Sequence, residues 1–107
     1  MIALEIIDRA GGKLARSFDS PHDGRGILIG RTGEADLILD KGSVSKRHAR
    51  IEARGDRYLL RDLGSTNGTY LNSRRIRGEV ALRPRDRIYL GEFIVRVLAI
   101  DALGSAV

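Results

Sequence analysis

Short apolar runs, separated by turn residues every few positions, constrain this chain more than any other feature. No stretch keeps a helical period over a dozen residues, and several runs alternate apolar and polar side chains with the period of two that is typical of β-strands. Glycine, proline, aspartate and asparagine occupy the intervals, where they favour turns. We expect strands over residues 2–7, 13–18, 26–30, 37–39, 49–53, 57–62, 70–71, 75–76, 80–82, 87–90 and 93–100.

This succession of strands predicts an all-β fold, an antiparallel β-sandwich of about ten to eleven short strands with no substantial helix. A chain of 107 residues with 42% apolar composition is long enough for one domain with one core. We predict one domain over residues 1–100 and a short flexible tail over residues 101–107. In such folds the loops at one end of the sandwich carry the binding residues.

The composition excludes several classes of protein and site. The absence of cysteine excludes disulfides, thiolate nucleophiles and cysteine zinc sites. His22 and His48 are the only histidines, so we predict no metal site, and we expect no cofactor. No window approaches the roughly 18 apolar residues of a membrane span, and the N-terminus lacks a secretory signal pattern. We therefore expect a cytoplasmic protein that binds no membrane.

The segment 62–70 is the most informative loop. It carries Gly-Ser-Thr-Asn-Gly-Thr over residues 64–69, between two apolar runs. Two glycines allow the chain to turn tightly and to expose its N–H groups, which suits a polar ligand and above all an anion. Taken alone, the segment is equally compatible with an ordinary β-turn that is capped by its own asparagine and serine side chains.

Two further loops, Gly30-Arg31 and the Ser-Lys-Arg-His segment 45–48, hold anion donors at predicted strand ends. In this order, Gly-Arg, Ser-x-x-His and Gly-Ser-Thr-Asn-Gly-Thr resemble the forkhead-associated (FHA) domain of bacterial type, over roughly residues 4–100. That family is a β-sandwich which recognises phosphothreonine in a peptide. The resemblance implies a phosphothreonine-dependent module that recruits a partner phosphorylated by a Ser/Thr kinase, or such a kinase itself.

The resemblance also implies the role of individual residues. It assigns contacts with the phosphate to Arg31, Ser45, Lys46 and Thr66, and contacts with the peptide backbone to Asn67. Arg31 follows a buried strand and offers a charge-assisted, bidentate contact, whereas the alternative is a surface arginine paired with Asp36 or Asp40. Lys46 is a flexible point charge, and a simply solvated lysine is its alternative.

A second group of residues is implied to shape the loops, namely Gly30, His48, Gly64, Ser65, Gly68 and Thr69. His48 is implied to form hydrogen bonds within and between loops and to hold the serine in place. Because no Gly-x-Ser-x-Gly elbow is present, we predict no hydrolytic triad, no catalytic residue and no enzyme activity. Arg47 is expected to be solvated or paired with acidic neighbours. Ser43 occupies a position that is basic in some family members, so one charge contact is missing.

Two other functions remain open. An FHA-type scaffold could bind a partner, or itself, without phosphate, and the oligomeric state is taken as monomeric by default. A net charge of +5 is also compatible with nucleic acid. Single-strand binders, however, stack bases on exposed aromatic side chains, and by alternation we place all five aromatic residues in the core: Phe18, Tyr58, Tyr70, Tyr89 and Phe93. We therefore expect no nucleic-acid partner.

Overall fold

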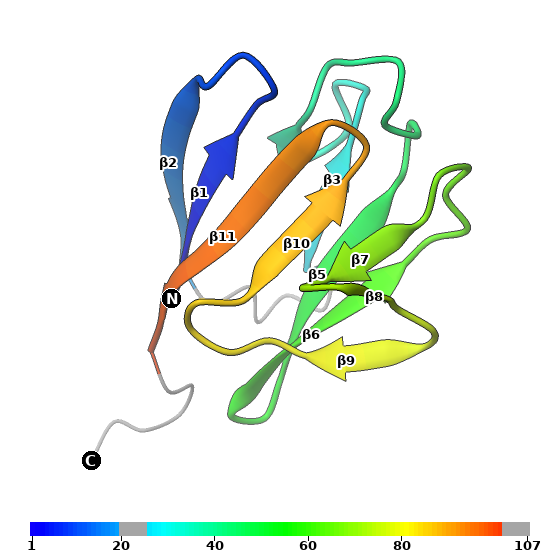
Figure 1. The fold of residues 1–107 in the computed structure, drawn as a ribbon. Helices are drawn as coiled ribbons and strands as arrows, with labels where there is room; N and C mark the ends of the chain where they lie inside the picture. The colour runs from blue at the N-terminus through cyan, green and yellow to red at the C-terminus, as the bar shows by residue number, and fades with distance from the viewer. Residues whose placement is uncertain (20–25, 102–107) are drawn as a thin grey trace.

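The computed structural model describes residues 1–19 and 26–101, which form two stacked β-sheets (Figure 1). The strands are β1 (Ile2–Ile7), β2 (Lys13–Phe18), β3 (Ile27–Gly30), β4 (Leu37–Ile38), β5 (Ala49–Arg54), β6 (Arg57–Asp62), β7 (Thr69–Leu71), β8 (Arg74–Arg75), β9 (Glu79–Ala81), β10 (Arg87–Leu90) and β11 (Phe93–Ile100). Residues 20–25, which include His22, lie outside the described residues, as does the predicted 101–107 tail after its first residue.

The two sheets confirm the predicted sandwich. One sheet has the order β2-β1-β11-β10-β7-β8, and the other has the order β4-β3-β5-β6-β9. Neighbouring strands run antiparallel except β3 and β4, which pair in parallel. The Asp36 carboxylate accepts a hydrogen bond from the Leu28 N–H (2.8 Å), and the Leu28 carbonyl accepts one from the Asp36 N–H (2.8 Å). These two bonds hold the 31–36 loop against β3, so that β4 runs parallel to β3.

The core lies between the sheets and follows the period of two. Successive side chains of a strand point to opposite faces, so β1 buries every second residue and β11 does the same over its first five. The most deeply buried large side chains come from both sheets: Ile2, Leu4, Ile27, Ile29, Ile51, Tyr58, Leu60, Ile88 and Leu90. This continuous core fixes the strand ends, and with them the loops that follow.

The prediction for the aromatic residues was partly wrong. Tyr58 and Phe93 are buried as predicted, and Phe18 packs at the edge of the core. Tyr70 and Tyr89, by contrast, are half-buried and lie opposite each other in the β7–β10 register. Ile88 and Leu90, on either side of Tyr89, both point inward, so alternation turns the tyrosine to the outer face of the six-stranded sheet.

Within residues 1–19 and 26–101 there is no helix that is long and apolar enough to cross a membrane.

The β7–β8 hairpin turns through Asn72 and Ser73, with Leu71 paired to Arg74. Asn72 has a φ of 57°, a left-handed conformation that asparagine tolerates better than most residues. This hairpin places the arginines of β8 beside the loops described next.

Candidate functional site

Three segments that are distant in the sequence meet at one end of the sandwich, and we call them the loop rim: residues 30–31, 43–48 and 62–69. Backbone and side-chain hydrogen bonds join them. The Arg31 N–H donates to the Ser45 carbonyl (3.1 Å), and the Thr66 N–H donates to Ser45 Oγ (3.1 Å). The Asn67 amide Nδ2 donates to the Ser43 carbonyl (2.9 Å). Arg31, Ser45, Thr66 and Asn67 therefore lie together, although the sequence separates them by up to 36 positions.

Arg31 follows the last residue of β3, and its side chain is oriented by one hydrogen bond. Its Nε donates to the Val44 carbonyl at 3.0 Å. Neither of the predicted alternative pairings, with Asp36 or Asp40, is among the ion pairs of the described residues, and Asp36 binds the Leu28 N–H instead. The two terminal nitrogens of the guanidinium group have no hydrogen bond to another described residue. These nitrogens are thus available to an anion.

His48 is completely buried and links two segments of the loop rim. Its Nδ1 accepts a hydrogen bond from the Ser45 N–H (3.1 Å), so the ring hydrogen of the neutral imidazole is on Nε2. Nε2 then donates to the Gly68 carbonyl at 2.8 Å. The backbone N–H of His48 also donates to the Ile29 carbonyl at 2.9 Å. The His48 imidazole therefore holds segment 43–48 of the loop rim against segment 62–69.

Three glycines of the loop rim occupy positions that favour glycine, one because of a close approach and two because of a positive φ. A Cβ atom on Gly30 would lie 2.0 Å from the Lys46 carbonyl oxygen, so a larger residue would force segment 43–48 away from β3. Gly68 has a φ of 84°, which favours glycine. Gly64 also has a positive φ, of 76°.

The Lys46 side chain is exposed, and its contact with a ligand stays a prediction.

Asp62 organises the 62–69 loop, although the sequence analysis gave it no role in the site. Its carboxylate accepts hydrogen bonds from the Ser65 hydroxyl, the Thr69 hydroxyl (2.7 Å) and the N–H groups of Gly64 and Ser65 (both 3.0 Å). Partial burial by itself would raise the pKa of this carboxyl, but the hydrogen bonds outweigh it and hold the pKa below its ordinary value. An aspartate two residues before a glycine at a strand end is the signal of such a self-bonded turn.

The Ser65 and Thr69 hydroxyls thus point into the loop, while other donors point out of it. Thr66, Asn67 and Lys46 are exposed, and Ser45 is half-buried. Ser45 Oγ accepts from the Thr66 N–H, which leaves its own hydrogen for a ligand. The outward-facing groups are therefore cationic or neutral donors, an arrangement that suits an anion with several oxygens.

Arg47 is exposed and pairs with Glu34 at 3.6 Å, in line with its prediction.

An open pocket of about 800 Å³ continues from Asn67 across the outer face of the six-stranded sheet. Both misassigned tyrosines, Tyr70 and Tyr89, line this pocket, together with Glu92 from the β10–β11 turn. The pocket extends the surface beside the loop rim, and the two half-buried tyrosines form part of its wall instead of part of the core.

The comparison with known protein families supports the resemblance. The model of the FHA domain matches residues 27–91. The curated protein "FHA domain-containing protein FhaB" of Mycolicibacterium smegmatis is 35% identical over 71 residues, which are 66% of this chain and 46% of that protein. The chain therefore spans less than half the length of this relative.

Solved structures give the same result. A crystal structure of the FhaA FHA domain complexed with the intracellular domain of Rv3910 superimposes with a TM-score of 0.76 at 33% sequence identity. The match covers 91% of this chain and 99% of that chain. Mycobacterium tuberculosis EmbR, in complex with a low-affinity phosphopeptide, has a TM-score of 0.72 at 27% identity and covers 96% of this chain and 26% of EmbR.

Proposed function

Because the chain belongs to the FHA-domain family, we propose that its loop rim binds a phosphothreonine side chain in a partner protein. The observation that carries this proposal is the meeting of Arg31, Ser45, Thr66 and Asn67 at one end of the sandwich. Phosphothreonine brings about −1.5 to −2 charges at pH 7 and three acceptor oxygens. The outward-facing donors of the loop rim match that charge and number of acceptors.

In this proposal Arg31, Ser45, Lys46 and Thr66 contact the phosphate. A hydrogen bond to a charged group contributes roughly 1.5–3 kcal/mol, and micromolar affinity requires about 8 kcal/mol. A few such contacts reach that value after the cost of association, and most of it is absent without the phosphate. The domain therefore distinguishes the phosphorylated from the unphosphorylated partner.

Asn67 binds the main chain of the partner on either side of the phosphothreonine. A side-chain amide both donates and accepts. Among the described residues only one Asn67 donor is taken, by the Ser43 carbonyl. His48, Gly30, Gly64, Ser65, Gly68 and Thr69 hold these groups in position. The proposed activity is recruitment in the cytoplasm, without a catalytic step. The solved structures of the FhaA FHA domain with the intracellular domain of Rv3910, and of EmbR with a phosphopeptide, support a phosphorylated protein as the partner. We propose that this partner is a Ser/Thr kinase or the substrate of one.

Calorimetric titration with a degenerate phosphothreonine peptide library and its unphosphorylated counterpart tests this proposal. The wild-type chain is expected to bind the phosphorylated library alone. Arg31→Ala removes the fixed cation and is expected to weaken binding at least about thirtyfold. Arg57→Ala is the matched control, because Arg57 is exposed and lies at the far end of the β5–β6 hairpin.

Equal binding of the two libraries would contradict the proposal and favour docking that does not require phosphate. Full affinity of the Arg31→Ala variant would remove Arg31 from the site. Both variants must unfold at the wild-type temperature for the comparison to count.

A further inference from the structure

Beside the loop rim, β8 presents Arg75 to the outer face of the six-stranded sheet. Arg75 lies opposite Tyr70 in the β7–β8 register, and cross-strand partners share a face. A Cβ atom on Gly68 would lie 2.7 Å from Arg75 Nε and 3.0 Å from its Cζ. The guanidinium group therefore covers Gly68, the residue after Asn67, and lies within reach of a segment that Asn67 binds.

Arg75 is exposed and has no hydrogen bond or ion pair with another described residue. The hairpin around it, residues 72–77, contains three arginines and no acidic residue. The next carboxylates along the chain are already engaged, because Glu79 pairs with Arg54 and Asp86 binds Asn72 and the Arg83 N–H. The charge of Arg75 is therefore not neutralised within the described part of the domain.

The other side of Asn67 carries the opposite charge. The Asn67 amide binds the Ser43 carbonyl, and the Ser43 hydroxyl donates to Glu92 Oε1 at 3.3 Å. The Glu92 N–H returns a hydrogen bond to Ser43 Oγ at 3.2 Å. A ligand that lies along Asn67 thus meets a carboxylate near Ser43 and a guanidinium group near Gly68.

We propose that Arg75 selects an anionic side chain of the partner, close to the phosphothreonine. The rigid donor fork of arginine matches a carboxylate or a second phosphate in a bidentate manner. Glu92 repels an anion on its own side, where Arg9 lines the same pocket and offsets part of that charge. We therefore place the preference on the Gly68 side of Asn67, next to Arg75. This inference rests on the proposed function and adds a chemical requirement on the partner sequence.

Fluorescence-polarisation titrations with a set of synthetic peptides test it. Each peptide has one phosphothreonine in a neutral sequence, with a single aspartate moved through four positions on either side, and a matched asparagine peptide. The proteins are the wild type, Arg75→Gln and Arg74→Gln. Arg74 is the matched control, because it is also exposed and lies on the same strand, but it pairs with Leu71 and points to the opposite face.

We expect aspartate at one or two neighbouring positions to tighten wild-type binding about fivefold over asparagine, the effect of one exposed ion pair. Arg75→Gln should abolish this preference, and Arg74→Gln should keep it. Phosphoserine at the same position separates the two sources of the anion. Tighter binding than aspartate identifies a second phosphate, and equal or weaker binding identifies a carboxylate.

Two failures are distinguishable. If the wild type binds none of the phosphothreonine peptides, the proposed function itself is refuted. If it binds them without a preference for aspartate, or if Arg75→Gln keeps the preference, the inference about Arg75 is overturned. An equal loss in Arg74→Gln would also overturn it, because net charge alone would then explain the preference.

Discussion

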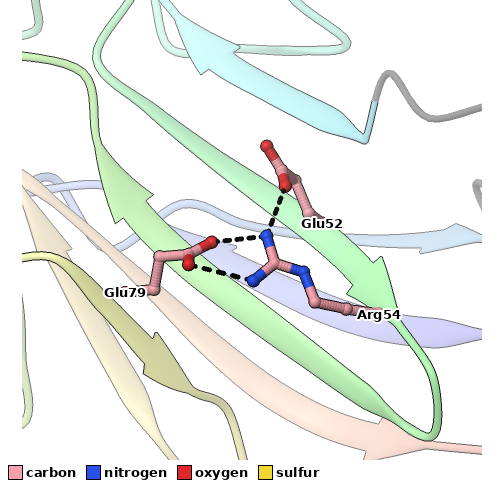
Figure 2. Close-up of polar contacts among 3 residues, drawn as sticks. All are labelled: Glu52, Arg54 and Glu79. Carbon is pink, nitrogen blue, oxygen red and sulfur yellow. Dashed lines mark hydrogen bonds and ion pairs between the residues drawn. The ribbon is translucent and has the colours of Figure 1, made fainter.

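Two polar clusters occupy opposite ends of the β5–β6 hairpin, and they differ in how their charges are satisfied. At the turn, Arg54 binds Glu79 through two hydrogen bonds (3.0 and 2.8 Å) and Glu52 through a third (3.3 Å), as Figure 2 shows. The bonds with Glu79 raise the pKa of Arg54 and lower that of Glu79. At the other end, Asp62 accepts its hydrogen bonds from its own loop.

The difference shows which charges are available to a ligand. The Arg54 cluster is exposed to solvent, where water competes with each contact, and its guanidinium group is already bound by two carboxylates. The Asp62 carboxylate instead takes up the inward donors of its loop, so that Asn67 and Thr66 face outward. Arg31 and Arg75, which have no acidic partner among the described residues, lie beside that loop. The Arg54 ion pairs therefore have a structural role, whereas Arg31 and Arg75 combine a free charge with a position beside the 62–69 loop.

The largest expected effect on stability is at His48, the buried residue of the loop rim. His48→Ala leaves the Ser45 N–H and the Gly68 carbonyl without a partner and opens a cavity, so we expect a loss of about 3 kcal/mol in the free energy of unfolding. Urea unfolding followed by circular dichroism measures it. Arg47→Ala, at the exposed neighbouring position, should change the value by less than about 0.5 kcal/mol. Equal midpoints for His48→Ala and the wild type would show that the imidazole does not support the loop rim.

A smaller effect is expected at Asp62. Its folded pKa lies below the ordinary value, so the ionised carboxylate stabilises the fold fully above about pH 3.9, the unfolded value, and this contribution is lost as the pH falls through the lower folded pKa. Asp62→Asn should lower stability at neutral pH by about 2 kcal/mol. It should also flatten the acid limb of a plot of stability against pH. Parallel acid limbs for the two proteins would contradict the assignment.

The smallest effect is expected at the exposed cluster. Arg54→Gln removes all three of its hydrogen bonds, yet solvent and salt screen these charges. We expect the thermal midpoint at physiological salt, and the affinity for a phosphothreonine peptide, to stay at the wild-type values. A loss of stability as large as that of Asp62→Asn would reverse the ranking of the two clusters.

The sequence by itself determined where the strands lie and which residues form the motif. A period of two is a local property, so alternation located β1, β6 and β11 at their observed bounds. The order of the Gly-Arg, Ser-x-x-His and Gly-Ser-Thr-Asn-Gly-Thr motifs identified the family. It also selected Arg31, Ser45 and Asn67, which the structure brings together.

Only the tertiary structure decided which groups are free and which are engaged. Whether a carboxylate reaches a particular donor depends on strand register and loop return, and these are set by pairing between residues far apart in the chain. Glu79 reaches Arg54 across β6, and Arg75 covers Gly68, only because β9 pairs with β6 and β8 pairs with β7 in the observed registers. Local pattern carries no information about such contacts between strands, so only the assembled sheets show which charges are left for a partner.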